Sequence, residues 1–167
     1  IKFQTYIGLS KNTLYTLSII PCFFIIYSFF WSYKLPKNGN FIQKHAEAVA
    51  AHCNVFALHI IARKQSEDFV IETETLNNVS ETIVYYKKVT TKIPLLHQFL
   101  KLSIRRKAHN LGYQEVLKKA KNIDFVHLNI CFPAGLFALH LKKKYNLPYI
   151  ISENWTVLLD SDPINFN

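Results

Sequence analysis

The chain has 167 residues, of which half are hydrophobic and 14% aromatic, so it is long and apolar enough for a core and is not a disordered polar tail. Its 20 basic and 11 acidic residues give a net charge of +9. This charge favours an anionic partner, such as a membrane surface, a phosphorylated ligand or nucleic acid, and is equally typical of a solvated basic surface. Cys22, Cys53 and Cys131 are too scattered for a disulfide frame or a zinc site, so we expect buried thiols in a reducing cytosol.

The first element is an uncharged stretch that allows two interpretations. From Asn12 to Tyr33 there is no charged residue. Leu14–Trp31 is close to the length of about 20 residues that spans a bilayer, so a membrane anchor is one interpretation. The other is a buried strand, which we expect at Phe23–Ser28, because the segment is rich in β-branched and aromatic residues and contains Pro21.

A turn at 35–40 leads to a helix expected at 41–51, where Asn40 is placed to cap the first free N–H groups. Apolar or alternating patterns then predict strands. These strands are expected at 55–62, 69–75 and 81–86, with a turn at 76–78 between the last two.

The next predicted helix runs from Pro94 to Ala120, and Gly112 is expected to break or kink it. Its apolar side is expected to hold Leu95, Leu96, Phe99, Leu102, Val116 and Leu117. The polar side carries Lys101, Arg105, Arg106, Lys107, Lys118, Lys119 and Lys121. We expect Arg105, Arg106 and Lys107 to lie exposed and to contact anionic lipid.

The last third of the chain predicts a strand at 125–130, a helix at 133–145 and a strand at 148–152. Pro133 in the first turn of the helix and lysines in its last turn suit the two ends, and Asn146 is a suitable stop. A strand, helix and strand joined by short links form a βαβ unit. The pattern therefore predicts an α/β fold with a mostly parallel sheet and helices on both faces.

Three polar segments follow strands, where ligands bind in parallel sheets: Trp31–Asn40, Asn129–Pro133 and Ser152–Thr156. Gly39 would let a phosphate approach the backbone at a helix start, although a turn glycine without a ligand is commoner. The last segment, rich in hydrogen-bonding groups, is either a ligand site or a polar strand end covered by Trp155.

Histidines give weaker signals. His127 alternates within a strand and is expected to be a satisfied core histidine. His45, His52 and His59 recur every seven residues, but that run crosses from helix to strand and predicts no metal face.

Several of these segments resemble family 4 (group 1) glycosyltransferases. Trp31 followed by Pro36-Lys-Asn-Gly-Asn-Phe-Ile-Gln-Lys-His-Ala-Glu-Ala-Val49 is similar to the opening of that family. Asp124-Phe-Val-His-Leu-Asn-Ile-Cys-Phe-Pro-Ala-Gly135 is similar to its strand Asp-x-Val-His-x-His with Phe-Pro-Ala-Gly after it. Tyr149-Ile-Ile-Ser-Glu-Asn-Trp-Thr156 looks like its Ser/Thr-Glu-His-Trp-Thr. Their order and spacing agree over roughly Phe23 to Leu159.

The resemblance implies a retaining transferase with two Rossmann-like domains, of which this chain is the N-terminal, acceptor-side half of a GT-B fold. It implies that Gly39 and Asn40 approach the donor phosphate and that position 154 lies near the reacting sugar. That position holds Asn154, which cannot take a proton at neutral pH, in place of the family's histidine. The acceptor cleft would be lined by Trp31, Asn129, Pro133, Glu153 and Trp155.

The expected organisation is an extra segment at 1–18 and a truncated acceptor-side domain at 19–167, without the donor-binding domain. The leading hypothesis is a glycosyltransferase portion, inactive alone, that uses a nucleotide-sugar and a glycan or lipid-linked acceptor, without metal or cofactor. We expect it in the cytoplasm, with peripheral contact at the inner membrane face. The alternative is a small membrane-anchored basic binding module. A nucleic-acid binder is disfavoured, because the basic residues lie on helix faces without interleaved aromatics.

Overall fold

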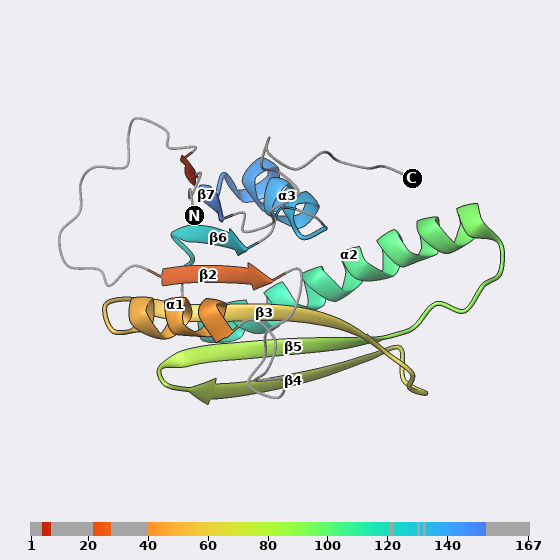
Figure 1. The fold of residues 1–167 in the computed structure, drawn as a ribbon, viewed down its shortest axis with the longest axis horizontal. Helices are drawn as coiled ribbons and strands as arrows, with labels where there is room; N and C mark the ends of the chain where they lie inside the picture. Colours follow the sequence, from red (N-terminus) through yellow and green to blue (C-terminus); the bar gives the residue numbers. More distant parts are fainter. Residues whose placement is uncertain are drawn as a thin grey trace.

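The computed structural model describes residues 5–7, 22–27, 40–120, 122–129, 131 and 133–152. Within these residues, seven strands form one sheet and three helices pack against it (Figure 1). The strands are β1 (Thr5–Ile7), β2 (Cys22–Tyr27), β3 (Asn54–Arg63), β4 (Phe69–Leu76), β5 (Val79–Lys87), β6 (Phe125–Asn129) and β7 (Tyr149–Ser152). The helices are α1 (Asn40–Ala50), α2 (Pro94–Lys119) and α3 (Gly135–Tyr145).

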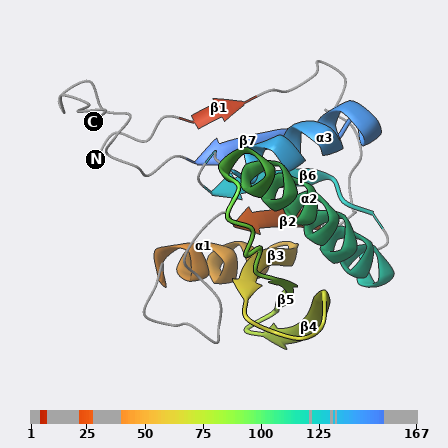
Figure 2. The same cartoon turned by 90° about the vertical axis from the view of Figure 1, so that its right-hand side faces the viewer.

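The sheet is mostly parallel, as the βαβ pattern predicted. Its order is β1-β7-β6-β2-β3-β5-β4, which Figure 2 shows from top to bottom. The inner strands β7, β6, β2, β3 and β5 all run parallel. The edge strands β4 and β1 are antiparallel to their neighbours. Thr5–Ile7, which forms β1, belongs to the 1–18 segment that the sequence set apart from the domain.

The uncharged stretch contributes the central strand of this sheet. β2 covers Cys22–Tyr27 of the predicted strand Phe23–Ser28, and Ser28 lies outside the described residues. Phe24 and Ile26 are fully buried in the cluster beneath α2 and α3, while Ile25 belongs to the cluster beneath α1. A strand covered on both faces is apolar at successive positions, which is why it also resembles a membrane span. No helix in the described part of the chain is long and apolar enough to cross a membrane.

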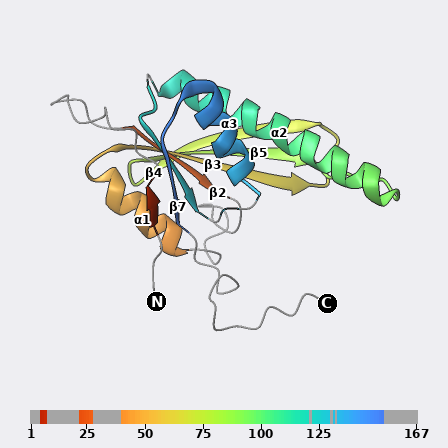
Figure 3. The same cartoon turned by 90° about the horizontal axis from the view of Figure 1, so that it is seen from above.

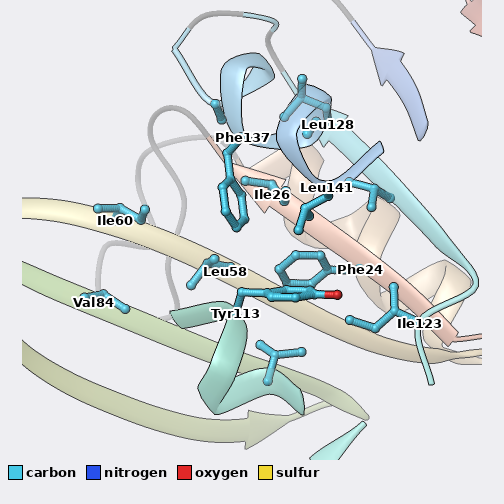
Figure 4. Close-up of a cluster of buried hydrophobic side chains, with 14 of the residues drawn as sticks. Phe24, Ile26, Leu58, Ile60, Val84, Tyr113, Ile123, Leu128, Phe137 and Leu141 are labelled. Carbon is cyan, nitrogen blue, oxygen red and sulfur yellow. The ribbon is translucent and has the colours of Figure 1, made fainter. Parts of the chain in front are cut away.

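Helices cover both faces of the sheet (Figure 3). On one face, α1 packs Ile42 and Ala46 against Val55 and Ala57 of β3. On the other face, α2 and α3 enclose the larger cluster. In Figure 4, side chains of β2, β3 and β5 belong to one cluster with the rings of Tyr113 and Phe137. The ring of Phe24 lies 5.5 Å from that of Tyr113, between centroids.

Gly112 does not break α2. The helix runs unbroken from Pro94 to Lys119, and Gly112 is buried against the sheet. A Cβ at this position would lie 2.3 Å from Leu58 Cδ1 and 2.9 Å from Val84 Cγ2. The glycine therefore permits a close approach between helix and sheet, so the expected break is wrong.

The apolar side of α2 is uncovered in the N-terminal half of the helix. The side chains of Leu95, Leu96, Phe99 and Leu102 are exposed, and the first buried residue of the helix is Ala108. In Figure 3 the start of α2 extends beyond the ends of the strands, so no sheet is present there to cover it. Further along, Val116 is buried as expected, and Leu117 is exposed.

The two ends of α3 differ in how well the sequence located them. Asn146 stops the helix as predicted, with a left-handed φ of 55° and its N–H bonded to the Lys142 carbonyl at 3.0 Å. Pro133 was expected in the first turn but lies before it. The helix begins at Gly135, whose N–H bonds to the Cys131 carbonyl, and Pro133 belongs to the turn that this bond closes.

The expectation of three buried thiols holds only for Cys22, which lies at the start of the central strand. Cys53 is partly buried in the link between α1 and β3. Cys131 is exposed in the turn between β6 and α3. The sequence could not distinguish these positions, because the burial of each cysteine depends on whether neighbouring helices and strands cover it.

Candidate functional site at the carboxyl edge of the sheet

The site lies where the order of the parallel strands reverses. From β2 the chain builds β3 and β5 on one side, then returns to place β6 and β7 on the other. Neighbouring crossovers leave in opposite directions at such a point, and ligands of open parallel sheets bind there, beyond the carboxyl ends of the strands. The pairing aligns Tyr27 of β2 with Asn129 of β6, and Asn129 with Ser152 of β7.

Asn129 is the residue that the sequence and the structure both place here. Its side chain is 2% exposed, and its Oδ1 atom has no hydrogen-bond partner among the described residues. A buried amide oxygen without a donor costs about 1–3 kcal/mol, so native proteins usually satisfy such groups. A hydrogen-bond donor that reached this oxygen would remove that cost.

His127 lies two residues earlier on the same face of β6. Its Nε2 atom is 2.8 Å from Ser152 Oγ, so the ends of β6 and β7 are joined by a side-chain hydrogen bond. Burial lowers the pKa of His127, and the nearby charge of His45 on α1 lowers it further. A neutral imidazole at pH 7 can accept or donate one hydrogen bond at each nitrogen.

Two members of this group were missed by sequence reasoning. Ser152 was placed in a polar segment but not among the site residues, and His45 was considered only as a metal ligand. The signal for Ser152 was its place at the end of the strand that follows β6, because parallel neighbours end at one edge. The described residues hold no group of three or more side chains suited to a metal ion.

The start of α1 is the second element of the site. The helix begins at Asn40, the residue predicted to lie at its start, and its first turn contains no acidic residue. The first backbone N–H groups of a helix lack partners within the helix and favour an anion. Because α1 lies between the parallel strands β2 and β3 in the chain, its start is expected toward the carboxyl side of the sheet.

Asp124 begins the segment that resembles the transferase strand, and it has a structural role at the amino ends of the parallel strands. Its carboxylate accepts a hydrogen bond from the Cys22 N–H at 2.9 Å, and its own N–H donates to the Cys22 carbonyl. The residue therefore holds the start of β6 against the start of β2. That register is what brings Asn129 beside Tyr27.

The remaining predicted site residues divide into two groups. Trp31, Gly39, Glu153, Asn154 and Trp155 lie outside the described residues. Pro133 is buried in the wall of a crevice between α2 and α3, together with Arg105 and His109. The structure thus associates Pro133 with α2.

The arrangement suits recognition of a polar ligand by hydrogen bonds. An amide oxygen, a neutral imidazole and a serine hydroxyl lie along one edge, near a helix start that favours an anion. Asn129 cannot take or supply a proton, which leaves His127 as the one titratable group of this trio. Comparison of the chain with protein-family models, with curated proteins and with solved structures found no match.

Proposed function

We propose that this chain is the acceptor-side, N-terminal portion of a retaining GT-B glycosyltransferase. Three segments that resemble family 4 transferases support this function, together with the parallel strand order. With β2 as the first strand, the parallel strands follow the order of a Rossmann-like half. The observation that carries the proposal is the buried Asn129 oxygen, which lacks a donor beside the point where the strand order reverses.

In this proposal the edge of the sheet holds the sugar acceptor. Asn129 Oδ1 accepts a hydrogen bond from a hydroxyl, and His127 and Ser152 position the neighbouring part of the glycan. Gly39 and Asn40 face the donor diphosphate at the start of α1. Asn154 positions the reacting sugar by hydrogen bonds and does not act as an acid or base.

This half-site does not transfer sugar alone. Transfer requires the charge that develops on the donor diphosphate to be stabilised by groups already in place. In the resembling family, most of those groups belong to the second domain. It also requires donor and acceptor to be held together, and proximity is a large part of catalysis. The partners are a nucleotide-sugar and a glycan or lipid-linked acceptor, with no metal, in the cytoplasm.

The test is a nitrogen-15 NMR titration of the chain with UDP-glucose, GDP-mannose and methyl glucoside. We expect the Asn129 side-chain amide to shift, with a dissociation constant near 1 mM, equivalent to about −4 kcal/mol. Asn129→Ala should abolish binding, whereas Asn110→Ala, an exposed asparagine on α2, should leave it unchanged. Mass spectrometry should detect no glycosylated product.

Two results would overturn the proposal in different ways. If none of the three compounds shifts Asn129, the reversal point is not a sugar site. If the chain alone binds a nucleotide-sugar at micromolar concentration and forms product, it does not need a second domain.

A further inference from the structure

The N-terminal half of α2 exposes a ridge of large apolar side chains. Leu95 is 84% exposed and Phe99 is 70% exposed, and Leu102 continues the ridge. Their spacing of four and three residues places them along one side of the helix. This half of α2 extends beyond the strands in Figures 1 and 3. Because the ridge projects from the sheet, a flat surface could contact all three side chains.

The ridge continues onto α3. Leu136, which is 59% exposed, and Leu139 line a crevice of about 360 Å³ between α2 and α3, and Leu102 lines the same crevice. Leu102 also borders the apolar groove that runs along the start of α2. These five leucine and phenylalanine side chains therefore form one continuous surface. We call it the α2–α3 face: Leu95, Phe99, Leu102, Leu136 and Leu139.

Among the described residues, the charged side chains that line the crevice of the α2–α3 face are all basic. Arg105, Arg106 and Lys143 line the crevice beside the apolar side chains. There is no acidic residue from Val89 to Gln114, and α3 contains none. An apolar surface bordered by cations, without acidic neighbours, is complementary to a surface that is apolar inside and anionic outside.

The structure divides the basic triplet that the sequence treated as one group. Arg105 and Arg106 line the crevice beside α3, and Arg105 is half-buried where full exposure was expected. Lys107 lies on the other flank of α2, in a hollow with Asp68 and Phe69 at the start of β4. Successive helical residues point about 100° apart, so three adjacent residues cannot share a face. Of the triplet, only Arg105 and Arg106 border the α2–α3 face.

We propose that the α2–α3 face docks on an anionic phospholipid bilayer. Leu95 and Phe99 enter the boundary between headgroups and acyl chains. Arg105, Arg106 and Lys143 contact lipid phosphates at the mouth of the crevice. A bilayer fits better than an acidic protein because the apolar side chains stand on a projecting ridge, which a flat, deformable surface accommodates without a matching groove. This inference goes beyond sugar transfer and does not depend on it.

The test compares binding to vesicles of phosphatidylcholine alone with binding to vesicles that also contain an equal part of phosphatidylglycerol. We expect the chain to float with the anionic vesicles and to remain in solution with the neutral ones. Each basic residue near an anionic surface contributes about fivefold in affinity. Replacing both Arg105→Gln and Arg106→Gln should therefore weaken binding by more than tenfold at low salt. The matched control is Lys118→Gln with Lys119→Gln, which removes the same charge from exposed positions at the far end of α2.

A second pair of variants tests the apolar contribution. Leu95→Ser with Phe99→Ser should weaken binding to anionic vesicles by at least tenfold, whereas Leu117→Ser, at an exposed leucine of the same helix, should not. The substituted positions are exposed, apart from the half-buried Arg105, and circular dichroism before and after heating checks that each variant folds.

Three results would overturn the proposal. In the first, the control lysine pair reduces vesicle binding as much as the arginine pair, so that net charge alone is responsible. In the second, the serine variants bind anionic vesicles as well as the parent chain does. In the third, gel filtration shows a dimer that Leu95→Ser with Phe99→Ser converts to a monomer, so that the face binds a second copy.

Discussion

At the residue scale, the alternation of β6 explains how polar side chains reach the candidate site. His127 and Asn129 are two residues apart, so they share the face that α1 covers, while Val126 and Leu128 enter the cluster under α2 and α3. Asn129 is the last residue of β6, so its buried amide lies at the carboxyl end of that strand.

Gly112 provides a stability test at the same scale. Gly112→Ala should lower the free energy of unfolding by about 1–2 kcal/mol, because overpacking against Leu58 and Val84 outweighs the better helix propensity of alanine. Urea unfolding monitored by circular dichroism measures the change. Asn110→Ala, exposed on the same helix, should be neutral or slightly stabilising. If Gly112→Ala were as stable as the parent, α2 would not need the close approach.

At the element scale, the β4–β5 hairpin is shaped by its local turn sequence and by one contact with α1. The β4–β5 hairpin has a two-residue loop, Asn77 and Asn78, with positive φ of 49° and 63°. This is the geometry of a type I′ turn, which matches the twist of the flanking strands. Asn77 also donates a hydrogen bond from Nδ2 to Glu47 Oε1 at 2.8 Å, which joins the hairpin to α1.

The hairpin predicts opposite effects for two changes at one position. Asn78→Gly should raise the free energy of unfolding by about 0.5 kcal/mol, because glycine adopts positive φ without strain. Asn78→Val should lower it by about 1–2 kcal/mol, the cost of a left-handed conformation for a residue with Cβ branches. Thr75→Val, which places valine in the adjoining extended strand, is the control and should cost nothing. Equal stability of the glycine and valine variants in urea would contradict the turn geometry.

At the scale of the whole molecule, buried histidines on opposite faces of the sheet couple stability to pH. Burial lowers the pKa of His59 to about 4. Burial likewise lowers the pKa of His109 to about 4. The charge of Arg105 lowers it further, and the hydrogen bond between Nδ1 and the Arg105 carbonyl opposes the shift. His59 shares the α1 side of β3 with Ala57, and His109 lies on α2. Both are neutral in the folded protein at pH 7.

The sign of the pH effect follows from these two pKa values. Because the folded-state pKa is below the ordinary value of 6.5, the stabilisation is complete above pH 6.5 and is lost as pH falls towards 4. In that interval the unfolded chain binds protons that the folded chain does not. Each histidine should lower the free energy of unfolding by up to about 1.4 kcal/mol per pH unit. Urea unfolding at pH 7 and pH 5 measures this loss.

The control variants separate these histidines from the other titratable groups. His59→Gln with His109→Gln should remove most of the difference between pH 7 and pH 5, although both changes lower stability. His52→Gln, at an exposed position, should leave the difference unchanged. A parent chain equally stable at both pH values would show that the two imidazoles are not buried in the neutral form.

Local patterns by themselves predicted the described helices and strands in their order along the chain, except β1. Continuous apolar runs gave β2 and β3, helical spacing and end residues gave α1 and α3, and Asn146 located the end of α3 within one residue. The parallel pairing also followed, because a short strand–helix–strand unit has few ways to return to the same sheet. In the candidate site, Asn129 and Asn40 could be located because both stand at the end of an element.

Only the tertiary structure decided which apolar side chains are covered. Leu95 and Phe99 have the same helical spacing as core residues, but the start of α2 extends beyond the strands, so no described element covers these two side chains. The role of Gly112 depended on Leu58 and Val84, which are distant in sequence. The hydrogen bond between His127 and Ser152 required two strands to end in register. These features are set by the distances between layers and the lengths of neighbouring elements, which residue spacing along one chain does not contain.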